Sequence, residues 1–201
     1  ALAGERILVR IVKIARNYAY GKLLHMIQKS PYRVEPLCPY FKACGGCQLQ
    51  HLSYAVQLDY KTRKVRDALQ RIGHLEHVTV LPALGMDEPW GYRNKAQFPV
   101  GLVKDQFTLG FYAARSHNLI NIEQCPIQHG VSGKVTAMIR KFIHTYNIPV
   151  YQESTHRGII RHVVTKVGFR SHQLMIIIVT NGELPRKKEL VSILREGLPA
   201  V

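Results

Sequence analysis

The sequence predicts an α+β protein in which antiparallel strands are covered by two or three helices. Apolar and polar residues alternate along several short segments, as expected for half-buried strands, and these segments follow one another across short turns. Other segments repeat apolar residues every three or four positions, which is the period of a helix packed on one face. Strands grouped in this way favour α+β over an alternating α/β arrangement. With 201 residues, 46% of them hydrophobic, the chain is long enough for one or two domains.

The first 35 residues are expected to form the end of a small β-barrel. Residues 7–14 and 22–27 read as strands, and residues 17–21 mark a turn or bulge between them. A proline-punctuated linker at 30–36 and a cysteine-rich loop up to about residue 52 follow. Ser53 is a good N-cap for a helix that Gly73 ends, and the basic residues on its other face favour a solvated surface.

Residues 36–201 are predicted to form a second domain that holds most of the strands. Strands are expected at 78–84, 92–103, 108–114 and 119–122, and a helix is expected at 131–146, before Pro149. A turn at Lys104-Asp105 would join the second and third of these strands, and Pro99 suggests an edge strand or a bulge. Residues 159–169 and 173–180 form a predicted hairpin, and Pro185 opens a last helix.

All four cysteines fit a pattern that is typical of an iron–sulfur site. Cys38, Cys44 and Cys47 follow the spacing C-x5-C-x2-C, and Cys125 lies far downstream. A [4Fe-4S] cubane needs four thiolates, one for each iron, and a remote fourth ligand would tie two parts of the chain together. Gly45-Gly46 leaves space around such a core and permits a tight backbone wrap.

Other uses of the four cysteines stay open at this point. Structural zinc also takes four thiolates, but its sites usually come as two short C-x2-4-C pairs. Two disulfides are a further alternative, although a chain of this length does not need covalent staples. Radical chemistry on S-adenosylmethionine depends on C-x3-C-x2-C and does not fit this spacing. A cubane with four thiolates has no iron open to substrate, so it would stabilise the fold or transfer electrons.

The charge balance predicts a polyanionic partner. The chain has 28 Lys and Arg against 13 Asp and Glu, a net charge of +15, which favours nucleic acid over a basic surface that serves only solubility. Residues 90–95 and 111–117 mix aromatic rings with cations, and residues 157–162 add further cations. An unstacked base can lie on a ring or guanidinium plane while a nearby cation binds phosphate. The predicted RNA-binding residues are Tyr92, Arg93, Lys95, Arg115, His117, Arg161 and His162.

Several other classes of function find no support in the sequence. Residues 130–135 are only superficially like a phosphate-binding loop, because Gln128 stands at the first glycine position and Val135 at the metal-binding Ser or Thr. No apolar run approaches a membrane span, and charges interrupt the N-terminal segment, so we expect a cytoplasmic monomer without a signal peptide. The chain starts without Met and ends without a polar tail, so we expect it to be a piece of a longer protein.

The run from Cys38 to His51, with the sequence CPYFKACGGCQLQH, resembles the bacterial RNA (uracil-5-)-methyltransferases that act on 23S ribosomal RNA. Residues 92–95 and 125–128 extend the resemblance, which covers essentially the whole chain. It implies that the residues before about 35 are the end of a TRAM domain, a small RNA-binding β-barrel. The central domain would follow, with a [4Fe-4S] cluster bound by Cys38, Cys44, Cys47 and Cys125.

The resemblance also implies the reaction of the parent enzyme. In that family a uridine is flipped out of RNA, a cysteine attacks C6, S-adenosylmethionine methylates C5, and a base removes the C5 proton. The catalytic residues and the methyl-donor site belong to a C-terminal domain that has no match here. The chain alone is therefore expected to be inactive, with no catalytic residue of its own. The alternative function is a non-catalytic RNA-binding protein with a structural Fe–S or zinc site.

Overall fold

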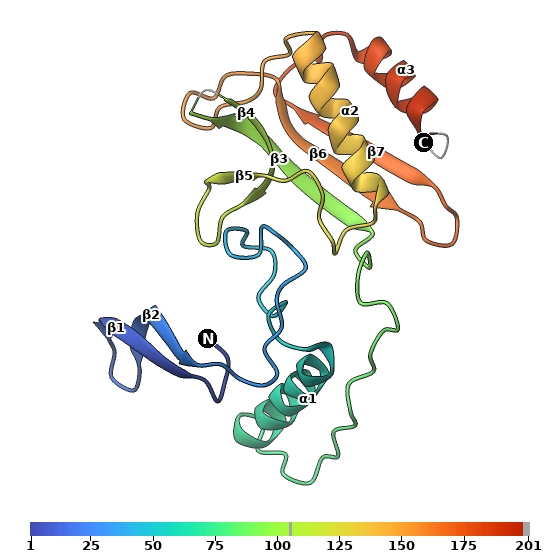
Figure 1. Cartoon of the computed structure of the whole chain (residues 1–201). Coiled ribbons are helices and arrows are strands. Elements are labelled where there is room, and N and C mark those ends of the chain that lie inside the picture. Colours follow the sequence, from blue (N-terminus) through green and yellow to red (C-terminus); the bar gives the residue numbers. More distant parts are fainter. Residues whose placement is uncertain (105, 199–201) are drawn as a thin grey trace. The chain divides into compact units, whose positions relative to one another are not determined.

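The protein, described by a computed structural model over residues 1–104 and 106–198, has the predicted α+β organisation. Within these residues, strands β1 to β7 pair antiparallel in two sheets, and three helices, α1 to α3, accompany them (Figure 1). The chain divides into two compact units, which are Ala1–Pro36 with Leu49–Gly85 and Leu37–Gln48 with Met86–Val201. All four cysteines therefore belong to the second unit.

The first unit opens with the two predicted strands. β1 (Arg6–Ile14) pairs antiparallel with β2 (Ala19–Gln28), from Arg6↔Gln28 to Ile14↔Ala19. Leu8 on one face and Ile11 on the other are both about half exposed, so neither face of this hairpin is fully covered. The described residues form a two-stranded sheet and no closed barrel. The assignment of this hairpin to a TRAM domain remains a prediction.

An ion pair with a covered carboxylate joins the start of β1 to the linker after β2. The Arg33 Nε donates to Glu5 Oε1 at 2.5 Å, and its Nη2 donates to Oε2 at 2.8 Å. The hydrogen bonds from Arg33 hold the pKa of Glu5 well below its usual range, against the opposing effect of burial. Glu5 is therefore ionised at neutral pH, and the pair fixes the linker against the hairpin.

The predicted helix after Ser53 is confirmed as α1 (Tyr54–Arg71). Ser53 occupies the N-cap position, but its side chain makes no capping hydrogen bond. The strand predicted at 78–84 is wrong, because this segment pairs with no strand. The end of the segment contacts α1 instead, where the Ala83 N–H donates to Thr62 Oγ1 at 2.9 Å. Leu84 is 98% exposed, which shows that the apolar pattern there reflects no buried sheet face.

The second unit is built on a five-stranded antiparallel sheet in the order β5-β4-β3-β6-β7. The sequence predicted these strands closely, including the β6–β7 hairpin and the short β5 that leads to Cys125. Asp105, in the predicted turn at Lys104-Asp105, lies outside the described residues. The strand bounds are β3 (Lys95–Val103), β4 (Gln106–Tyr112), β5 (Leu119–Asn121), β6 (Ile160–Val167) and β7 (Leu174–Thr180).

Pro99 lies in the central strand, so the predicted edge strand is wrong, and the pairing of residues 95–103 has no register shift that would mark the alternative, a bulge. β3 pairs with β6 over residues 95–99 and with β4 over residues 100–103. Pro99 is the last partner on the β6 side, opposite His162, at the point where β3 changes its pairing. Its missing N–H is tolerated because a different ladder begins at the next residue.

Two helices cover one face of this sheet and form the core with it (Figure 1). α2 (Val131–Thr145) buries Val135, Ile139 and Phe142 almost completely, as its period predicts. α3 (Lys187–Gly197) adds Leu190 and Leu194 to the same core; it begins two residues after the predicted Pro185.

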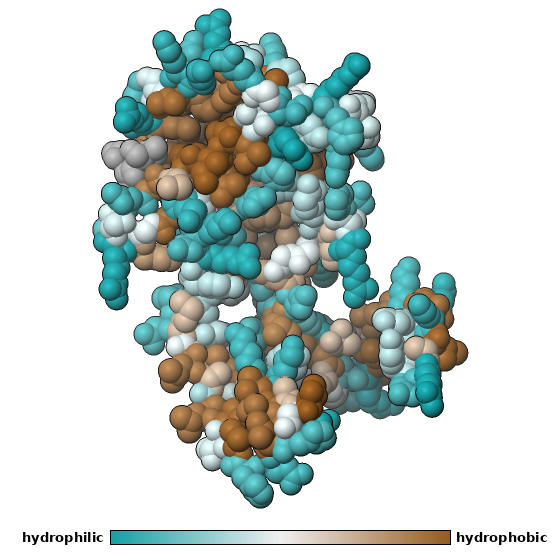
Figure 2. Space-filling view, turned by 180° about the vertical axis from the view of Figure 1, so that it is seen from behind, coloured by the Kyte–Doolittle hydropathy of each residue, from teal (hydrophilic) through white to brown (hydrophobic). Residues whose placement is uncertain are grey.

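No helix of residues 1–104 and 106–198 covers the opposite face of the sheet, and apolar side chains gather over it (Figure 2). Met175, Ile177 and Val179 of β7 are exposed there, because they alternate with core residues along the strand. None of the helices in the described residues is long and apolar enough to cross a lipid bilayer.

Candidate functional site

The four cysteines line one cavity in the second unit. The cavity has a volume of about 570 Å³, within the usual range for small-ligand sites. Cys38, Cys44 and Cys47 come from the segment Leu37–Gln48, which we call the cysteine loop, and Cys125 comes from the connection between β5 and α2. The fold thus brings together the local and the remote cysteines that the sequence grouped. All four are present as thiols. We call this space the cysteine cavity.

Backbone contacts hold the cysteine loop against the end of β4. Cys44 forms an antiparallel bridge with Ala113, and the Gly45 N–H donates to the Tyr112 carbonyl at 3.1 Å. A Cβ atom on Gly45 would lie 2.9 Å from the Ala114 Cα, a distance that real side chains do not tolerate. Glycine is therefore required at this position by the close approach of two backbones. A Cβ on Gly46 would make only an ordinary contact, at 3.4 Å from Cys44 Sγ.

The segment that carries Cys125 is fixed by pairing with the residues before β3. The Gly91 N–H donates to the Pro126 carbonyl and the Arg93 N–H to the Ile127 carbonyl, both at 2.9 Å. In return, the His129 N–H donates to the Arg93 carbonyl at 3.0 Å. These bonds fix the residues just after Cys125 against the segment that leads into β3.

Arg140 of α2 braces the chain just before Cys125. Its guanidinium donates to Asn121 Oδ1 at 2.6 Å, to the Ile122 carbonyl at 3.0 Å and to the Leu109 carbonyl. Burial lowers the pKa of Arg140, and Glu123 opposes this effect. A guanidinium remains charged under such conditions, and here it donates to three acceptors at once, two of them partly buried backbone carbonyls.

Burial and mutual proximity shape the chemistry of the thiols. Burial raises the pKa of Cys125, backbone N–H groups of Ile127 and Gln128 lower it, and the nearby Cys47 and Cys38 raise it further. The pKa of Cys38 is raised in the same way by burial and by its neighbours Cys47 and Cys44. The Gly46 N–H also points to Cys44 Sγ at 3.4 Å. The cavity thus offers thiols that favour the protonated form until a cation binds, together with N–H donors aimed at sulfur.

Within residues 1–104 and 106–198, no three His, Cys, Asp or Glu side chains are gathered closely enough to hold one metal ion. Ligands of a single zinc ion all lie about 2.3 Å from the same atom, whereas each ligand of a cubane binds a different iron. The thiols of the cysteine cavity are the kind of ligand that both zinc and an iron–sulfur cluster use. Among the described residues, however, they are not arranged to bind a single metal ion.

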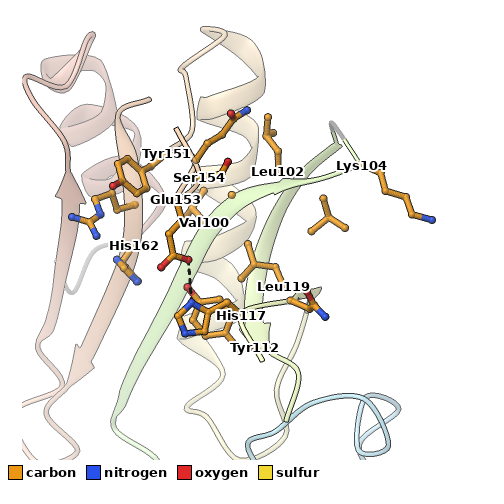
Figure 3. Close-up of a pocket in the computed structure, with 15 residues that line it drawn as sticks. Val100, Leu102, Lys104, Tyr112, His117, Leu119, Tyr151, Glu153, Ser154 and His162 are labelled. Carbon is orange, nitrogen blue, oxygen red and sulfur yellow. Dashed lines mark hydrogen bonds and ion pairs between the residues drawn. The ribbon is translucent and has the colours of Figure 1, made fainter. Parts of the chain in front are cut away.

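A second cavity of about 720 Å³ lies on the helix-free face of the sheet (Figure 3). Tyr112 and His117 stack at 5.2 Å between ring centroids, and both residues also line the cysteine cavity. His117 Nδ1 pairs with Glu153 Oε2 at 3.1 Å, which links the loop after β4 to the loop before β6. We call this space the sheet cavity; the Tyr112–His117 pair forms a common wall of the two cavities.

Five of the seven predicted RNA-binding residues line one or both of the two cavities. Arg93 and Arg115 line the cysteine cavity, and Arg161 and His162 line the sheet cavity. His117 lines both. Tyr92 and Lys95 line neither of them, although both are exposed at the start of β3. The residues therefore surround two hollows rather than form one flat surface.

Several residues of the site were not found from the sequence. Tyr151 and Glu153 lie in a loop whose sequence has no strong pattern, and they reach the sheet cavity only through the fold. Gln128 lines the cysteine cavity with its side-chain Oε1 buried and without a hydrogen-bond partner among the described residues. Its place directly after the C-P-I sequence is the one signal that could have identified it.

Comparison with known proteins relates the chain to RNA methyltransferases. It is 46% identical over 202 residues to a protein of Halalkalibacterium halodurans and 45% identical over 202 residues to one of Clostridium tetani. Both relatives are named uncharacterized RNA methyltransferases. Each match covers 100% of this chain but 44% of the relative, so the chain spans less than half the length of these curated relatives. No family model matches the chain.

Among solved structures, the chain is similar to Pyrococcus abyssi tRNA (uracil-54, C5)-methyltransferase in complex with S-adenosyl-L-homocysteine. The TM-score is 0.67 at 28% identity, and the match covers 93% of this chain and 42% of that one. The similarity therefore includes nearly all of the chain and less than half of the tRNA-modifying enzyme.

Proposed function

We propose that this chain is the RNA-recognition and [4Fe-4S]-binding part of an S-adenosylmethionine-dependent 23S rRNA (uracil-5-)-methyltransferase. The observation that carries the proposal is the gathering of Cys38, Cys44, Cys47 and Cys125 around one cavity. Similarity over the whole chain to proteins named RNA methyltransferases supports the parent enzyme class. The choice of ribosomal RNA rests on the sequence resemblance around the cysteines, since the solved neighbour acts on tRNA.

The residues present fit an iron–sulfur cluster on three counts. Four sulfur donors line the cavity, and thiolate is the ligand that such clusters require. Backbone N–H groups point to the sulfurs of Cys44 and Cys125, and such donors stabilise a negatively charged cluster. If the buried side-chain amide of Gln128 rotated so that its oxygen and nitrogen exchanged places, its NH₂ group would be a further donor toward the same cavity.

In this proposal the four cysteines bind the cluster, and the cluster connects the cysteine loop to the Cys125 segment. When bound, it would supply a structural cross-link and the capacity for one-electron transfer. Arg93 and Arg115 then lie beside a negatively charged group as well as facing solvent. Their charge would stabilise the deprotonated thiolates, and their exposed ends would remain available for phosphate.

RNA binding is proposed for the cations and rings that line the two cavities and for Tyr92 and Lys95 near the start of β3. They are Tyr92, Arg93, Lys95, Arg115, His117, Arg161 and His162, and they belong to a chain with a net charge of +15. We assign the methyl-donor site and the catalytic residues to the part of the longer relatives that this chain does not span. The solved neighbour, which binds S-adenosyl-L-homocysteine, supports a methyl donor of this kind for the parent protein. The chain alone would bind RNA without methylating it.

Removing two cations near the start of β3 tests the RNA-binding proposal. The double variant Arg93→Ala/Lys95→Ala is expected to bind structured RNA more weakly and to lower the slope of log K against log salt by about 1 to 2, because two phosphate contacts are lost. Fluorescence anisotropy at several salt concentrations measures both effects.

The matched control removes the same charge from the helices on the other face. Lys141→Ala/Lys188→Ala takes two exposed cations from α2 and α3, and it should leave the slope almost unchanged. Equal slopes for both double variants would mean that net charge alone attracts RNA. No change for Arg93→Ala/Lys95→Ala would remove these two residues from the interface.

A further inference from the structure

We propose that the sheet cavity binds a single unpaired base of an RNA. This inference rests on the proposed RNA binding and goes further, because it assigns a defined site to one base rather than a basic surface to phosphates. The cavity of about 720 Å³ is roomy enough for a nucleoside with accompanying water. It lies on the helix-free face of the sheet, where RNA can approach without displacing a helix (Figures 2 and 3).

Tyr151 provides a flat surface that is already held in place. The Arg161 guanidinium lies 4.4 Å from the centroid of its ring, and the Tyr151 hydroxyl is 2.9 Å from His156 Nδ1. The ring is therefore restrained both at its face and at its tip, so little rotamer freedom is lost when a base stacks on this group. Aromatic rings and guanidinium planes are the surfaces on which unpaired bases stack.

The opposite wall of the cavity can read the edge of a base. Figure 3 shows the stacked Tyr112 and His117 across the cavity from Tyr151, with Glu153 reaching toward His117. The Glu153 carboxylate accepts hydrogen bonds, so it can accept one from a ring N–H or an exocyclic amino group. The same carboxylate repels phosphate, which directs the base rather than the backbone toward this wall.

Apart from Arg161 and Glu153, the interior of the cavity is lined mainly by uncharged residues, and Lys104 lies at its edge. Burial and the neighbouring Arg161 lower the pKa of His162, and burial raises the pKa of Tyr112, so both side chains are neutral at neutral pH. Leu119 adds an apolar surface. Lys104 is exposed and extends away from the cavity in Figure 3, where it can bind a phosphate of the same strand. An interior that holds one cation and one carboxylate among uncharged groups, with a further cation at its edge, suits a nucleotide better than a free anion.

The test compares single-stranded and duplex RNA with the whole chain. Tyr151→Leu is expected to weaken binding of a single-stranded oligonucleotide about 5- to 100-fold, the range measured for loss of one base–aromatic stack. Affinity for a blunt duplex of equal length should not change. Tyr151→Phe should keep the single-strand affinity, because the ring remains. An oligonucleotide with one 2-aminopurine should show quenched fluorescence with the unaltered chain and not with Tyr151→Leu.

Tyr146→Leu is the matched control, because Tyr146 lies on the helix side with Arg186 over its ring at 5.9 Å. It should bind both RNAs normally. If Tyr151→Leu binds single strands normally, or weakens single-strand and duplex binding equally, the base site is wrong while RNA binding itself stands. If the unaltered chain binds neither RNA, both the proposed function and the base site are overturned.

Discussion

Replacing Cys125 with serine is expected to abolish the iron–sulfur chromophore of the anaerobically purified chain. The thiol is partly buried near the sulfurs of Cys38 and Cys47, and in the proposed site it is the one ligand supplied from outside the cysteine loop. A hydroxyl binds iron poorly at neutral pH, so one corner of the cubane would be left without a ligand. The bound iron should fall from about four per chain to a small fraction of that value. Iron and sulfide analysis, with the visible absorption spectrum, measures the loss.

The fold should survive this substitution, because Cys125 lies outside the main hydrophobic core. Tyr40→Phe is a suitable control, since Tyr40 lines the same cavity but carries no sulfur. It should retain the cluster. Full iron content in Cys125→Ser would show that the remote cysteine is not a ligand. Only the three cysteines of the loop would then remain as candidate ligands.

Replacing Gly45 with alanine is expected to detach the cysteine loop from β4. The added Cβ would meet the Ala114 Cα at 2.9 Å and the Tyr112 carbonyl oxygen at 3.3 Å, and these backbone atoms have no rotamer through which to move aside. Overpacking of this kind costs about 1–3 kcal/mol, which is enough to favour an undocked loop. The variant should therefore incorporate much less cluster, while thermal unfolding of the sheet changes little.

Gly46→Ala provides a control one residue away. Its Cβ would contact Cys44 Sγ at 3.4 Å without a clash, so the cluster content should match that of the unaltered chain. Equal iron content in Gly45→Ala and Gly46→Ala would mean that the contact between the loop and β4 does not determine cluster binding.

The helices and strands of the second unit could be predicted because the spacing of their apolar residues matches a single buried face. Val135, Ile139 and Phe142 repeat at helical spacing, and all three are buried in the core. The same reasoning failed at residues 78–84, where alternation marks an extended segment without a partner strand. Sequence alternation indicates that a strand is suitable for pairing, but only the fold decides whether a partner lies beside it.

The grouping of the cysteines could be predicted from the sequence, but the wall of the cavity around them could not. Their spacing predicted one site made from residues 38–47 and 125, and the fold places all four around one cavity. The wall formed by Tyr112 and His117 could not be predicted, because it depends on where β4 ends relative to the loop. The predicted RNA-binding residues were chosen from stretches that mix rings and cations, whereas the fold places five of them along two cavities and leaves Tyr92 and Lys95 outside both.

The most direct test of the proposed site is metal and sulfide analysis of the unaltered chain purified without oxygen, together with its electronic spectrum. A [4Fe-4S] cluster on the four cysteines predicts a brown protein with about four irons and four sulfides per chain. A colourless protein that contains one zinc and no sulfide would contradict the iron–sulfur assignment.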